Sequence, residues 1–152
     1  MVDVCLELLM KKANEAVTIG KLIYPIIREA GFNTEDINSV EEEYEIQAIK
    51  SSIFVDRMLK DKNGKPTCAL QAKKVGDTYL LGGDIKKTLP HTLKAGIQYS
   101  VFTEGTEWRL YKEGRHYRTL YLRGQNAKRD QEYLVDFLKS IRERYKNDYK
   151  SC

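Results

Sequence analysis

The sequence has few of the residues that form stabilising disulfide bonds or zinc sites in small domains. Its cysteines, Cys5, Cys68 and Cys152, form an odd set with no CxxC spacing and no cysteine–histidine cluster. Neither a disulfide framework nor a zinc site is therefore predicted. This pattern favours a reducing compartment, and we expect a cytoplasmic protein.

Long apolar runs and several common motifs are also missing. No stretch approaches the roughly 18 consecutive apolar residues of a membrane span, and Asp3 and Glu7 stand where a secretion signal would be basic and then apolar. We expect no membrane partner. His91 and His116 are the only histidines and lack metal-ligand spacing, which favours isolated surface positions. Without GxxxxGK[ST], ATP-driven translocation would need another polypeptide.

What the chain does have is enough apolar residues for one core, and an uneven charge. Its 152 residues, 41% of them hydrophobic, fit a single domain over 1–152. Residues 1–50 carry five Lys/Arg and ten Asp/Glu, whereas residues 51–152 carry 21 and 12. A basic surface favours a polyanion such as DNA or RNA, because phosphate contacts release counterions. A lysine-rich solvated surface explains the charge equally well.

The spacing of apolar residues predicts helices around strands. Helical spacing from Val4 to Ala30, closed by Gly31, predicts one or two helices. The acidic segment 33–43, which includes Glu41-Glu42-Glu43, is predicted to be a solvated loop. Strands are predicted over 44–49, 52–60, 67–75, 97–103, 108–112 and 116–122, and helices over 84–96 and 129–148.

One predicted hairpin brings polar residues together. Asn63-Gly64 between two strand-like segments predicts a two-residue type I′ turn. Counting outward from that turn places Asp56 opposite Gln71, with Cβ atoms about 4.5–5.5 Å apart. Lys73 lies two positions along the strand and points to the same face.

These three residue types suit phosphodiester hydrolysis. The oxygens of Asp56 and Gln71 can ligate Mg²⁺, which polarises a phosphoryl oxygen and lowers the pKa of water, while the Lys73 ammonium can stabilise negative charge. A solvated face of an ordinary hairpin is the alternative, and the pattern alone favours it.

Three segments resemble a known family of nucleases. The run 55–74, with Asp56 before the turn and Gln71-Ala72-Lys73 after it, is similar to the D…ExK core of PD-(D/E)XK nucleases. It is most similar to the N-terminal nuclease domain of type I restriction enzyme R subunits and related small restriction-endonuclease-like proteins. Residues 99–111 resemble the family's "LTNG-x-x-W-x-L/F-Y" segment, and residues 14–32 its first helix.

The resemblance implies a fold and a role for each residue. The fold is α/β (α+β in some classifications), restriction-endonuclease-like, with a central mixed β-sheet flanked by helices. Asp56 would be the main metal ligand, Gln71 the second ligand, Lys73 the catalytic lysine and Glu15 an auxiliary acid. The implied activity is that of a Mg²⁺- or Mn²⁺-dependent DNA endonuclease of restriction or defence type. RNA remains open as a substrate, and so does assembly into a homo-oligomer or a larger restriction complex.

Two departures from the family keep a second function open. Gln71 replaces the usual glutamate, which removes a negative charge and should lower Mg²⁺ affinity, although Mrr-type restriction endonucleases also resemble this chain in using Gln-x-Lys. Residues 84–96 lack the Gln-x-x-x-Tyr pair of many relatives. The alternative is a catalytically inactive module that binds nucleic acid or a protein partner.

Further residues are candidates for contacts with nucleic acid. Basic residues suited to backbone contacts are Lys74, Lys86, Lys87 and Arg109, with others between residues 115 and 129. Such contacts would give affinity without sequence specificity. Trp108 and Tyr121 could stack on bases, but the alternating pattern favours core positions for these rings.

Overall fold

The computed structural model describes residues 14–48 and 50–143, which are built around one six-stranded sheet. Its strands follow one another in chain order: β1 (Val40–Ala48), β2 (Ser51–Lys60), β3 (Pro66–Ala72), β4 (Tyr99–Thr103), β5 (Glu107–Lys112) and β6 (Arg115–Tyr121). β3 and β4 are parallel, and the other neighbours are antiparallel. The mixed sheet with its helices confirms the predicted α/β class.

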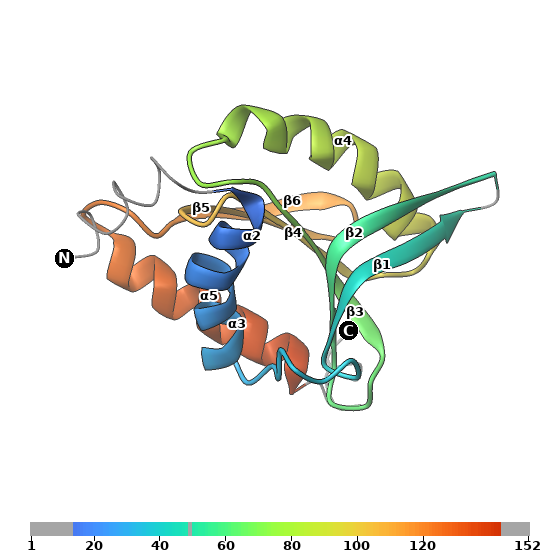
Figure 1. The fold of residues 1–152 in the computed structure, drawn as a ribbon, viewed down its shortest axis with the longest axis horizontal. Coiled ribbons are helices and arrows are strands. Elements are labelled where there is room, and N and C mark those ends of the chain that lie inside the picture. Colours follow the sequence, from blue (N-terminus) through green and yellow to red (C-terminus); the bar gives the residue numbers. More distant parts are fainter. Residues whose placement is uncertain (1–13, 49, 144–152) are drawn as a thin grey trace.

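Helices cover both faces of the sheet (Figure 1). Helix α4 (Thr78–Lys94) connects the parallel strands β3 and β4 and packs mainly on β1 to β4. Parallel neighbours need such a crossover, because the chain must return to the end of the sheet where the first strand began. The other face carries α2 (Glu15–Thr18), α3 (Tyr24–Glu29) and α5 (Ala127–Arg142).

The first helical segment is continuous from Glu15 to Glu29 but changes its winding. A π-helical turn, η1 (Ile19–Ile23), joins α2 to α3, and Pro25 lies in the first turn of α3. Proline has no N–H to donate, so it fits best where a regular helix begins. The predicted helices over 4–30 are confirmed from residue 15 onward, and residues 4–13 lie outside the described part. None of the described helices is long and apolar enough to span a bilayer.

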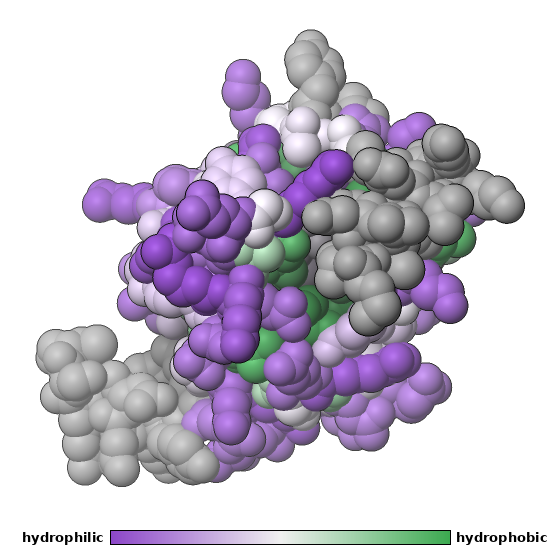
Figure 2. All heavy atoms as spheres, turned by 90° about the vertical axis from the view of Figure 1, so that its left-hand side faces the viewer, coloured by the Kyte–Doolittle hydropathy of each residue, from purple (hydrophilic) through white to green (hydrophobic). Residues whose placement is uncertain are grey.

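The larger core lies between the sheet and the helices η1, α3 and α5. Its fully buried side chains include Ile23, Ile27, Leu70, Trp108, Leu110, Leu120, Leu134 and Leu138. Trp108 is therefore a core residue, as the alternating pattern predicted, whereas Tyr121 is 52% exposed. Figure 2 views one end of the molecule, where a strip of hydrophobic residues is visible between hydrophilic side chains.

The acidic triplet does not lie in a loop, so that prediction is wrong. β1 begins at Val40, and Glu41 and Glu42 pair with cations of the neighbouring strand. Glu41 lies 2.7 Å from the Lys60 ammonium, and Glu42 lies 3.5 Å from the Arg57 guanidinium. Opposite charges on facing strands stabilise the pairing, which a sequence window considered alone cannot show.

The β2–β3 turn also differs from its prediction, although the register beyond it does not. Only Gly64 has a positive φ, and the loop is closed by a 2.9 Å hydrogen bond from the Asp61 N–H to the Lys65 carbonyl, so this is not a type I′ turn. A register shift follows between Leu59 and Lys60. The longer loop and this shift cancel, which restores the expected pairing from Leu59 outward.

Candidate active site

Asp56 and Gln71 lie side by side where β2 and β3 separate. The paired residues of these strands end at Arg57 and Leu70, and beyond them side chains replace the backbone ladder. The Gln71 Oε1 accepts a 3.0 Å hydrogen bond from the Asp56 N–H, and its Nε2 donates to the Phe54 carbonyl at 3.3 Å. The Asp56 Oδ2 in turn accepts from the Ala72 N–H at 2.7 Å. The two residues therefore hold each other's strand.

Glu15 reaches the same point from α2. A side-chain hydrogen bond joins it to Asp56, and the pKa of Glu15 is raised by burial and by the nearby Asp56 charge. Burial also raises the pKa of Asp56, although the Ala72 N–H and Glu15 hydrogen bonds oppose this. Two half-buried carboxyls in contact repel each other when both are ionised, so the pair ionises at higher pH than isolated carboxyl groups do.

Lys73 points to this site and is paired with Asp84 of α4. Its ammonium lies 3.2 Å from the Asp84 carboxylate, and both side chains are about three-quarters buried. Burial lowers the pKa of Lys73, but the charges of Asp84, Glu15 and Asp56 outweigh burial and raise it. Lys73 is therefore a cation that cannot readily give up its proton.

Asp84 is a site residue that the sequence analysis missed. The helix was predicted to begin at residue 84, but it begins at Thr78, and Asp84 lies in its second turn. There it shares a face with Leu81 and Thr88, which are 0% and 1% exposed. Asp84 lies three residues after Leu81 and four residues before Thr88, and this helical spacing was the sequence signal that could have placed its carboxylate on the buried face.

A divalent ion would need a small rearrangement of these groups. Across residues 14–48 and 50–143, no group of three His, Cys, Asp or Glu side chains stands ready to hold one. The Glu15 and Asp56 oxygens share a hydrogen bond, however, so a cation that replaces the proton would find both within reach. The Gln71 oxygen keeps a second lone pair. Such hard oxygen donors fit Mg²⁺ or Mn²⁺.

The predicted DNA-contact residues are spread more widely. Lys74, Lys86 and Lys87 are exposed, and Lys86 lies on the outer face of α4, about 200° around the helix from Asp84. Arg109 is better placed, because Gln71 pairs with Phe102, and Phe102 with Arg109. Gln71 and Arg109 therefore share a face, about 10 Å apart across two strand spacings.

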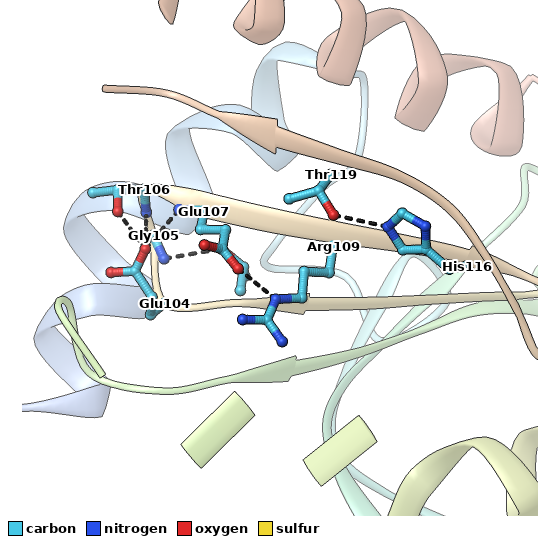
Figure 3. Close-up of polar contacts among 8 residues, drawn as sticks. Glu104, Gly105, Thr106, Glu107, Arg109, His116 and Thr119 are labelled. Atoms are coloured by element: carbon cyan, nitrogen blue, oxygen red, sulfur yellow. Dashed lines mark hydrogen bonds and ion pairs between the residues drawn. The ribbon is translucent and has the colours of Figure 1, made fainter. Parts of the chain in front are cut away.

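A second residue that the sequence analysis did not single out is Glu104, which organises the turn between β4 and β5 (Figure 3). It is fully buried, and its carboxylate accepts from the Thr106 and Glu107 N–H groups at 3.0 and 2.6 Å. The other oxygen accepts from the Gly76 N–H at 2.7 Å. Glu104 thereby fixes the loop that follows Lys73. A glutamate beside a turn glycine carries no sequence signal of burial.

Comparison of the chain with protein-family models, with curated proteins and with solved structures found no match. The features that bear on function are therefore the geometry of Glu15, Asp56, Gln71, Lys73 and Asp84 and the three segments that resemble a nuclease family.

Proposed function

We propose that this chain is a Mg²⁺- or Mn²⁺-dependent DNA endonuclease with the restriction-endonuclease-like fold. The observation that carries the proposal is the convergence of three carboxylates and one lysine from four separate elements. Glu15 comes from α2, Asp56 from β2, Lys73 from the end of β3 and Asp84 from α4. Clusters of half-buried charged groups often mark functional sites, since desolvating them costs free energy.

Each residue has a distinct role in the proposed reaction. A bound Mg²⁺ would polarise the phosphoryl oxygen and lower the pKa of the attacking water. Glu15 and Asp56 would hold it through their carboxylates, with help from the Gln71 oxygen. Lys73 stays protonated, so its ammonium stabilises negative charge at the phosphate and does not act as a base. Asp84 positions that ammonium.

A second candidate is a nucleic-acid-binding module without catalysis. One observation favours it: the Gln71 amide is bonded at both ends to the backbone of β2, and Asp56 is bonded to that of β3. These bonds give both residues a structural reason to be present. The candidate predicts DNA binding that needs neither a metal ion nor the Asp56 charge.

A cleavage assay separates the two candidates. Plasmid and linear DNA are incubated with the purified chain in Mg²⁺, in Mn²⁺ and in EDTA. Asp56→Asn is the informative variant, because asparagine still offers an oxygen to the Ala72 N–H while losing the charge. We expect metal-dependent cleavage that Asp56→Asn and Lys73→Ala each reduce about a hundredfold or more.

The matched control removes one carboxylate and one lysine elsewhere. Asp136→Asn with Lys139→Ala changes two exposed residues of α5 and should cleave like the wild type. Equal cleavage by all variants would reveal a contaminant. Binding without cleavage by the wild type in either metal would favour the second candidate.

A further inference from the structure

The end of the sheet that holds Lys73 also holds the end of β6. β3 and β4 finish together, since Ala72 pairs with Thr103. β6 runs in the same direction and finishes at Tyr121, which pairs with Glu107 at the start of β5. The segment from β6 into α5 therefore begins three strands away from Lys73, at the same end of the sheet.

Tyr121 lies on the face that Lys73 uses, whereas Lys128 and Arg129 lie at the start of α5, which covers the other face of the sheet (Figure 1). Leu120 is buried in the α5-side core, so the next residue, Tyr121, points to the opposite face. Helix α4 packs on that face mainly against β1 to β4 and leaves β6 largely uncovered. The Tyr121 ring is accordingly 52% exposed.

The charge of this segment has one sign. Residues 114–129 contain five Arg/Lys and no Asp/Glu, and all five basic residues are exposed: Arg115, Arg118, Arg123, Lys128 and Arg129. The acids next to it along the chain are Glu113, which is exposed, and Asp130, which is buried, accepts a 2.9 Å hydrogen bond from the Tyr121 N–H and lies 3.6 Å from the Arg129 guanidinium. Glu132 is exposed one turn beyond Lys128 on α5. The β6–α5 connection belongs to the end shown in Figure 2, where hydrophilic side chains cover most of the described surface.

We propose that Tyr121, Arg123, Lys128 and Arg129, here called the β6–α5 surface, bind the phosphodiester backbone of DNA beyond the bond that is cut. The inference rests on the proposed function for the identity of the partner. It adds a docking surface outside the catalytic residues, one that binds DNA without metal. The exposed cations of this segment outnumber the exposed acids beside it along the chain, Glu113 and Glu132, and such an excess of positive charge matches a polyanion, because each phosphate that it neutralises releases counterions.

The spacing suits one strand of nucleic acid. Three strand spacings of about 4.8 Å separate β3 from β6 by roughly 14 Å. Phosphates along one strand of a duplex advance by about 3.4 Å, so about four nucleotides span that distance. A strand whose scissile phosphate lies at Lys73 can therefore reach the β6–α5 surface, where Tyr121 offers a ring on which an exposed base can stack.

The test measures DNA binding without cleavage. Fluorescence anisotropy in EDTA follows a labelled duplex of about 20 base pairs and its single strand, long enough to cover site and surface. The variant combines Arg123→Gln, Lys128→Gln and Arg129→Gln. The matched control, Lys62→Gln with Lys65→Gln and Lys139→Gln, removes the same charge from other exposed positions.

We expect at least one of the two probes to bind, with affinity about tenfold or more weaker for the surface variant and little changed for the control. The slope of log affinity against log salt should fall by about 2 to 3 in the surface variant. Equal losses in variant and control would overturn the inference, and so would failure of the wild type to bind either probe at low salt.

Cleavage by the same proteins in Mg²⁺ and Mn²⁺ separates this inference from the proposed function. Cleavage by the wild type with normal binding by the surface variant would overturn the surface alone. Binding that depends on the surface without any cleavage would support the surface and leave the nuclease proposal contradicted.

Discussion

The side-chain amide of Gln71 both donates and accepts hydrogen bonds. Its nitrogen donates to the Phe54 carbonyl and to the Thr88 hydroxyl, at 3.3 and 3.4 Å, while its oxygen accepts from the Asp56 N–H. A glutamate at this position would keep the acceptor but lose both donors. The glutamine thus fits the separated strands, whereas a glutamate would serve a metal ion better.

Gln71→Glu should therefore change stability and metal affinity in opposite directions. In EDTA the carboxylate would face the Phe54 carbonyl, and we expect a loss of about 1–3 kcal/mol in the free energy of unfolding. Added Mg²⁺ should stabilise the variant more than the wild type, because the extra negative charge strengthens its binding. Thermal unfolding with and without Mg²⁺ measures both effects. A variant as stable as the wild type in EDTA would contradict this account of Gln71.

The environment of Glu15 and Asp56 gives stability a pH dependence of definite sign. Both pKa values are raised in the folded state. The stability that follows from this is complete below about pH 4, the ordinary range of carboxyl groups, and is lost as pH rises through the raised values.

Glu15→Gln removes one titrating group of this pair. Relative to the variant, the wild type should lose stability as pH rises from about 4 to 7 in EDTA, because the raised pKa of Glu15 contributes only in the wild type. Chemical denaturation at several pH values measures the difference. A wild type that gains on the variant over this range would contradict the raised pKa values.

At the scale of elements, Glu104 ties the loop after Lys73 to the β4–β5 turn. Glu104→Ala would leave the N–H groups of Gly76, Thr106 and Glu107 without their acceptor. Each such group costs about 1–3 kcal/mol, so we expect a loss above about 2 kcal/mol in chemical denaturation. Glu104→Gln keeps an oxygen and should lose less. Equal, small losses of stability in both variants would mean that the β4–β5 turn does not depend on the Glu104 carboxylate.

The first turn of α5 carries cations, although Asp130 in the same turn suits the helix dipole. Lys128 lies in the first turn, where the helix dipole disfavours cations, and the Asn126 side chain makes no capping hydrogen bond. We expect Lys128→Gln, which removes this cation without placing a like charge one turn from Glu132, to stabilise the protein by roughly 0.3 kcal/mol while weakening DNA binding. Denaturation and anisotropy on one preparation test both signs. Weaker binding with lower stability would indicate a damaged fold and not a lost phosphate contact.

At the scale of the whole molecule, the sequence predicted the sheet better than its connections. The pairing that brings Asp56 to Gln71 was predicted although the turn was not, because the longer loop and the shift near Leu59 compensate. Alternating apolar residues also placed Trp108 in the core. Both results follow from the two-residue period of a strand, which is local information.

Contacts between distant segments could not be predicted in the same way. Helix α4 begins six residues before its predicted start, and this earlier segment includes Gly82-Gly83, a pair that disfavours helix. Burial of Leu81 against the sheet is a tertiary effect that overrides this preference. For the same reason the pairing of Asp84 with Lys73 was missed, since it requires the placement of α4 on β3.

The most direct test of the central claim is a calorimetric titration of Mn²⁺ into the wild type and Asp56→Asn. We expect one bound ion per chain in the wild type and no measurable site in the variant, because in the proposed site Asp56 supplies the decisive ligand charge. Both proteins should otherwise show the same fold by circular dichroism. Identical isotherms for the two proteins, or no binding by the wild type, would contradict the proposed metal site.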